Sequence, residues 1–163
     1  MDIRKKLNEY LDLYLKPVER GTLFKSASAV GSYANFEYAS DINTYISDNK
    51  DEDTFQTKLF KLIDERGLKD SDVYNKVDID RRLFSKIRSN KDYHPSKETI
   101  ILFGLALELN ENEIEDLLKS ASYSLPMNTT FDLIIRFCFK EHIYDVNKVN
   151  EFLYDHNCKL LSE

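Results

Sequence analysis

Apolar residues recur at intervals of three and four along most of this chain, which is the spacing of one face of an α-helix. Ile3, Leu7 and Leu11 predict a first helix that ends near Leu15. From Thr54 onward the helical pattern is strong, and no segment alternates in the manner of a convincing strand. The sequence therefore predicts an all-α protein.

Capping residues and helix breakers set the bounds of the predicted helices. Ser, Thr, Asp and Asn accept hydrogen bonds at helix starts, and glycine suits the left-handed residue that follows many helices. These signals predict a helix from Thr54 to a stop at Gly67, a short helix capped by Asp70 or Ser71 and running through Val77, a helix Arg81 to Ser89 capped by Asp80, and helices Ser96 to Leu109, Asn110 to about Ala121, Thr130 to Glu141 and Asp145 to His156. The sequence IILFGLAL, within the helix from Ser96, is apolar on nearly every side, which is typical of a helix buried in a bundle.

Residues 19–53 differ from the rest because they are rich in Ser, Ala, Asn and Asp. We expect a short helix over residues 41–47 and a solvated linker in the charge run DNKDED. The N-terminal region as a whole is rich in aromatic residues, which suit either a small packed subdomain or a protein-binding surface: Tyr10, Tyr14, Tyr33, Phe36, Tyr38 and Tyr45. Three parts are therefore expected: residues 1–53, an N-terminal helix with a partly irregular segment and linker; residues 54–122, the main helical core; and residues 123–163, a C-terminal helical extension packed on that core.

Composition narrows the class of protein. The formal net charge is −6, and glycine (4) and proline (3) are scarce, which disfavours an all-β fold with many tight turns. No apolar run reaches the roughly 18–20 residues of a membrane span, and the charged N-terminus lacks the apolar core of a signal peptide. The two cysteines provide no disulfide framework. We expect a cytoplasmic protein without membrane contact and without a cofactor.

The most basic stretch of this acidic chain is DIDRRLFSKIRSNKDYHPS, residues 78–96, with the lysine that follows it. Six Lys and Arg side chains fall within seventeen residues, and only Asp92 opposes them there. Such side chains can neutralise DNA phosphates and read guanine edges. The candidate DNA-binding residues are Arg81, Arg82, Ser85, Lys86, Arg88, Ser89, Lys91, Tyr93, His94 and Lys97. A solvated basic helix that pairs with the protein's own acids is the plainer alternative.

The helices from Thr54 to Ser122 resemble, in order and length, the lambda-repressor-like helix-turn-helix domain of Cro/Xre regulators. The resemblance implies a five-helix core, in which the short helix Ser71–Val77 is the scaffold helix and Arg81–Ser89 is the recognition helix. The YHPS at 93–96 stands where that family often has Pro-Ser before its fourth helix. A narrower resemblance, carried by IDRRLFSKIRSNKDYHPSK and spanning residues 54–157, is to a poorly characterised helix-turn-helix family found mostly in Gram-positive bacteria.

The resemblance implies a non-enzymatic transcriptional regulator that binds double-stranded DNA through its basic recognition helix. A homodimer is expected because paired half-sites add affinity. Two positions depart from the family's pattern: Tyr74 stands where the scaffold helix usually has a small residue, and Asp78 stands where the turn usually has glycine. The alternative is therefore a module that uses the same fold to bind a protein, such as an antitoxin, a phage-defence component or an inhibitor.

Two other groups of residues suggest chemistry. Four residues of zinc-binding type lie near the C-terminus: Cys138, His142, His156 and Cys158. Their spacing matches no common zinc module, and Cys138 falls on an apolar helix face. Four others suggest a ribonuclease site with a histidine base: Arg88, Lys91, Tyr93 and His94. No second acid or oxyanion donor is positioned with them, so we expect neither a metal site nor catalysis.

Overall fold

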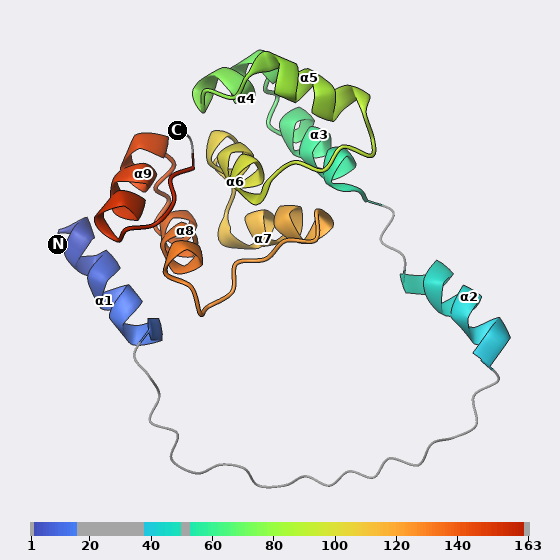
Figure 1. The fold of residues 1–163 in the computed structure, drawn as a ribbon. Coiled ribbons are helices and arrows are strands. Elements are labelled where there is room, and N and C mark those ends of the chain that lie inside the picture. Colours follow the sequence, from blue (N-terminus) through green and yellow to red (C-terminus); the bar gives the residue numbers. More distant parts are fainter. Residues whose placement is uncertain (1, 16–37, 50–52, 162–163) are drawn as a thin grey trace, which may run out of the picture. The chain divides into compact units, whose positions relative to one another are not determined.

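The computed structural model describes residues 2–15, 38–49 and 53–161, and these residues form α-helices without a strand (Figure 1). The helices are α1 (Ile3–Leu15), α2 (Tyr38–Asn49), α3 (Phe55–Glu65), α4 (Asp70–Lys76), α5 (Arg81–Ser89), α6 (Lys97–Ala106), α7 (Glu111–Ser120), α8 (Thr130–Lys140) and α9 (Val146–Asp155). The predicted all-α class is confirmed for these ranges. The expected irregular segment at 16–37 and the charge-run residues 50–52 lie outside them. None of the described helices combines the length and the apolar character needed to cross a bilayer.

Two compact units divide the chain. Residues 17–52 form one unit, and the residues before and after them form the other. Of the first unit the structure describes α2, which is longer than the predicted helix 41–47 and exposes Ile42, Tyr45 and Ile46. All other described helices belong to the second unit, called the helical body below.

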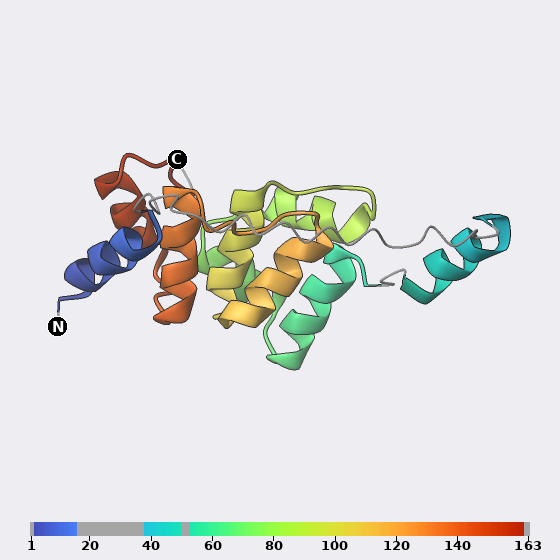
Figure 2. The same cartoon turned by 90° about the horizontal axis from the view of Figure 1, so that it is seen from below.

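The helical body is built around α6. Its residues 100–106 are all buried, which accounts for its apolar sequence on every side. α6 contacts both α4 and α7, and α7 also contacts α3 (Figure 1, Figure 2). A β-carbon added to Gly104 would lie 2.5 Å from Ile114 Cδ1 and 2.9 Å from Phe139 Cζ. The missing side chain therefore allows α6 to approach α7 and α8 closely.

The C-terminal helices and α1 join the same core. α8 packs against α7 and α9, and α1 packs against α8 although more than a hundred residues separate them in sequence. Leu7 and Leu11 of α1 are buried, and the ring centroids of Tyr10 and Phe137 lie 5.3 Å apart. Residues 2–15 are thus part of the helical body, whereas the sequence grouped them with residues 16–53.

The helix starts agree largely with the predicted caps. In α3, α5, α6, α7 and α9 the cap side chain accepts a hydrogen bond from the first turn, and the caps are Thr54, Asp80, Ser96, Asn110 and Asp145. The prediction for α4 is wrong. Its N-cap is Lys69 rather than Asp70 or Ser71, because the Asp72 carboxylate reaches back and accepts the Lys69 backbone N–H at 3.1 Å.

Six of the described helices end in one geometry, the Schellman motif, in which a residue with positive φ is followed by an N–H that bonds to the carbonyl five residues back. After α3 the left-handed residue is the predicted Gly67, and after five other helices it is Asp78, Glu108, Ser122, His142 and Asn157. Because Glu108 has a φ of 53°, α6 ends at Ala106 and not at Leu109 as predicted. Among the described connections, α3–α4, α4–α5 and α6–α7 have four residues each.

Candidate nucleic-acid interface

The predicted contact residues lie on α5, in the loop that follows it and at Lys97, the first residue of α6. A four-residue turn, residues 77–80, connects α5 to α4, the predicted scaffold helix. Asp78 has a φ of 54°, the left-handed conformation that a glycine usually adopts in such a turn. The Asp80 carboxylate accepts the Arg82 backbone N–H at 2.6 Å and begins α5. The turn therefore forms in spite of the missing glycine.

The inner face of α5 is anchored in the core. Phe84 and Ile87 are buried, and the Phe84 ring contacts three other aromatic rings. The centroid distances from Phe84 are 5.5 Å to Tyr74, 5.8 Å to Phe103 and 5.9 Å to Phe60. These rings come from α3, α4 and α6, so the outer face of α5 is presented on a helix that is held from three sides.

The outer face of α5 carries six predicted contact residues, all of them exposed: Arg81, Arg82, Ser85, Lys86, Arg88 and Ser89. Within the described part of the chain, the guanidinium groups of Arg81 and Arg82 have no ion pair, hydrogen bond or ring contact. Both belong to the first turn of α5. Their donors are therefore available to an acceptor outside the chain, such as a phosphate or a base edge.

Two cations nearer the end of α5 have internal partners. Arg88 donates to the Asp70 carboxylate of α4 at 2.6 Å, and its guanidinium lies 4.0 Å from the centroid of the Phe60 ring. Lys86 Nζ lies 4.4 Å from the centroid of the Tyr93 ring. Arg88 is thus paired with an opposite charge within the fold, whereas Lys86 contacts an uncharged ring and has no counter-charge among the described residues.

The remaining candidate DNA-binding residues, in the loop after α5 and at the start of α6, have different surroundings. Lys91 is exposed and contacts no partner among the described residues. The His94 ring packs on the Tyr123 ring with centroids 5.2 Å apart. Lys97 donates to the buried Asp132 carboxylate of α8 at 2.5 Å, and this ion pair links α6 to α8.

Three residues outside the predicted set hold this surface in place: Gln56, Phe60 and Asp70. The Gln56 amide donates to the carbonyl groups of Ile87 and Arg88 at 2.6 and 2.7 Å, and so satisfies the end of α5. Phe60 and Asp70 position the Arg88 side chain. None of the three has a local sequence signal, because each meets α5 only in the folded chain.

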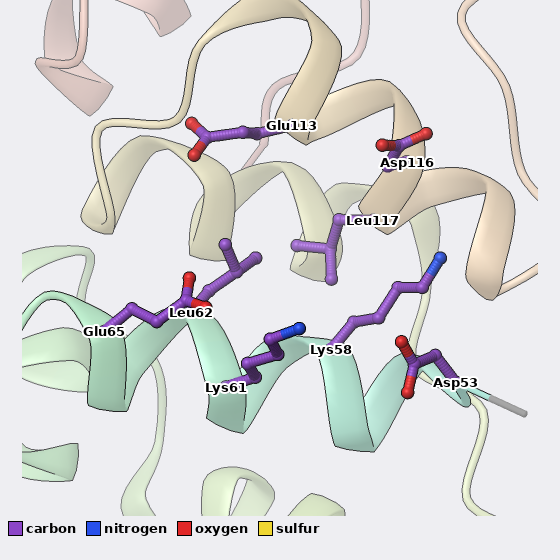
Figure 3. A pocket seen from close by; sticks show the side chains of 8 residues that line it. All are labelled: Asp53, Lys58, Lys61, Leu62, Glu65, Glu113, Asp116 and Leu117. Atoms are coloured by element: carbon purple, nitrogen blue, oxygen red, sulfur yellow. The ribbon is translucent and has the colours of Figure 1, made fainter.

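A second surface feature is a groove between α3 and α7 (Figure 3). Leu62 and Leu117 point toward one another in it, and two lysines and four carboxylates surround them: Lys58, Lys61, Asp53, Glu65, Glu113 and Asp116. The pKa of the Glu113 carboxyl lies below its ordinary value. Burial alone would raise this pKa, but the hydrogen bonds that the Asn110 N–H and the Arg66 guanidinium donate to the carboxylate lower it by more. The mixed charges of this groove indicate no particular ligand.

The residues of zinc-binding type have other surroundings. Burial raises the pKa of the Cys138 thiol to about 12, so the thiol stays protonated at neutral pH. Nδ1 of His142 lies 2.9 Å from the Tyr144 hydroxyl, and Nδ1 of His156 lies 2.8 Å from the Phe152 carbonyl oxygen. Within the described ranges, no group of three or more His, Cys, Asp or Glu side chains is arranged to hold a metal ion.

No protein-family model matches this chain, and no curated protein or solved structure is significantly similar to it. The family resemblance of residues 54–157 therefore stays a prediction. Function has to be inferred from the geometry and charge of the helical body.

Proposed function

We propose that residues 54–122 form a helix-turn-helix domain and that the protein is a DNA-binding transcriptional regulator. In this proposal α4 is the scaffold helix and α5 enters the major groove. One observation carries it: the exposed Arg81 and Arg82 have no internal partner in the described chain and stand at the start of a helix whose opposite face is anchored. In helix-turn-helix proteins the N-terminal residues of the second helix contact base edges.

The basic residues differ in what they can offer DNA. Arg81 and Arg82 supply forked donors that match guanine O6 and N7, or two phosphate oxygens. Arg88 offers less because Asp70 already neutralises it, and Lys97 offers less because its carboxylate partner lies in the core. The residues proposed to contact DNA are therefore fewer than the basic residues of the stretch 78–97.

A homodimer belongs to the proposal. A single small domain with few phosphate contacts binds DNA weakly, and two copies on paired half-sites multiply the affinity. The net charge of −6 leaves most of the chain acidic, which limits nonspecific attraction to DNA outside the basic face.

Selection from random duplexes, followed by affinity measurements on the selected and a scrambled sequence, tests the proposal. Arg82→Ala should lose about 1–3 kcal/mol on the selected duplex and less on the scrambled one, because a base contact is removed. Lys91→Ala should weaken both duplexes alike and reduce the slope of log affinity against log salt by about one, as a phosphate contact does. Lys119→Ala, an exposed lysine of α7, is the matched control and should change neither quantity.

Failure of the wild-type chain to bind any duplex at low salt would contradict the proposal. Equal affinities for Arg82→Ala, Lys91→Ala and the wild type would show that DNA binds elsewhere on the chain. A protein that co-purifies with the wild type and is lost from Arg82→Ala would instead favour the alternative function, a protein-interaction module on this fold.

A further inference from the structure

A groove lies between α4 and α5, beside the face that carries Arg82. Leu68, Tyr74 and Phe84 provide its apolar lining, and Lys69 and Arg81 provide positive charge. Leu68 precedes α4 and is 36% exposed, so part of this apolar surface is in contact with solvent. An apolar side chain that entered the groove would be covered from several sides.

Tyr74 gives the groove its apolar character. The Tyr74 ring is half-buried against Phe84, with centroids 5.5 Å apart, and both side chains line the groove. Aromatic side chains presented in this way are favoured at protein interfaces.

The charges of the groove favour an acidic occupant. Lys69 is exposed, and Arg81 has no partner in the described residues, whereas Arg88 is already paired with Asp70 at 2.6 Å. Two uncompensated positive charges therefore lie next to apolar surface. A DNA backbone suits this groove less well, because it has no apolar side chain to bury against Leu68 and Tyr74.

We propose that this groove binds a short acidic peptide segment of another protein. A Leu or Phe side chain of the segment lies against Tyr74 and Phe84, and its carboxylates pair with Lys69 and Arg81. Recognition of this kind combines an apolar anchor with charge complementarity. The groove shares Arg81 with the proposed DNA interface, but Leu68 and Lys69 lie outside the outer face of α5, so changes at these two residues test the peptide site separately from the DNA contacts.

Fluorescence anisotropy with the full chain tests this site. The probes are synthetic peptides of about twelve residues, rich in Glu and with a Leu or Phe at varied positions, and the control peptides carry Gln in place of every Glu. Leu68→Asp and Lys69→Glu should each weaken binding of the best acidic peptide about tenfold or more, because they remove the apolar contact and the charge attraction respectively. Arg82→Ala should leave peptide binding unchanged, because Arg82 does not line the groove.

The outcomes separate this site from the DNA interface. Failure of every acidic peptide to bind the wild type, equal binding of the Gln controls, or full binding by both groove variants would overturn the peptide site. If Leu68→Asp and Lys69→Glu lose DNA affinity as strongly as Arg82→Ala and retain the peptide, the groove belongs to the nucleic acid. Thermal melting of each variant establishes that the helical body is folded in the binding assays.

Discussion

Replacing Lys97 tests whether this cation stabilises the fold or serves the basic surface. Its ammonium group donates to Asp132, whose side chain is only 6% exposed. The change Lys97→Met keeps most of the length of the side chain and removes the charge. Asp132 then retains the hydrogen bond from the Thr129 hydroxyl, at 2.6 Å, but loses its counter-charge in a buried position.

The size of the effect follows from the burial of the pair. Removing one partner of a buried ion pair costs about 3–5 kcal/mol, because the remaining charge is uncompensated. The Lys97 side chain is 22% exposed, so water reaches part of the pair, and a loss of about 3 kcal/mol is expected. For a domain of this size, a loss of that magnitude lowers Tm by roughly 6–12 °C.

Thermal and urea unfolding followed by circular dichroism measure this loss. Lys91→Met is the control, because Lys91 is exposed, and it should stay within about 0.5 kcal/mol of the wild type. The double change Lys97→Met with Asp132→Asn should recover part of the loss, since no unpaired charge remains. A Lys97→Met protein that melts with the wild type and binds DNA more weakly would refute the structural role and return Lys97 to the DNA surface.

Two further predictions concern the core and its response to pH. Gly104→Ala should destabilise the helical body by about 1–2 kcal/mol in urea unfolding, because the clash with Ile114 and Phe139 outweighs the better helix propensity of alanine. A Gly104→Ala protein as stable as the wild type would show that α6 can move away from α7 and α8. Because the folded-state pKa of Glu113 lies below its ordinary value of 4.5, Glu113 contributes stability above that value, and the contribution is lost as pH falls through the folded pKa. Glu113→Gln should therefore lose less stability than the wild type between neutral pH and about pH 3, and identical pH profiles in denaturant titrations would contradict this assignment.

The helices were predictable from sequence where their signals are local. Thr54, Asp80 and Ser96 cap the helices that follow them, and a cap involves residues only two or three positions apart. The end of α6 was not predictable in this way. Glu108 adopts the left-handed conformation although it is not glycine, so no glycine marks the end of the helix. Leu107 and Leu109 continue the apolar pattern past that end.

For the candidate interface, helical periodicity predicts which side chains are exposed but not which partners they have. The spacing of Phe84 and Ile87 fixes which face of α5 is buried, and hence which side chains are exposed. The partners of Arg88 and Lys97 are 18 and 35 residues away, and the folded chain alone brings them together. Sequence reasoning therefore finds the basic face and overestimates how much of its charge is available.

The packing of α1 on α8 has a consequence for the order in which the chain folds. α4 and α5, α6 and α7, and α8 and α9 are neighbours in sequence that contact each other, and helical proteins with such local contacts fold in about microseconds to milliseconds. α1 reaches α8 only by closing a loop of more than a hundred residues, at an entropic cost that grows with loop length. On the ribosome α1 is synthesised before every other described helix, and yet it has no docking surface until α8 has emerged.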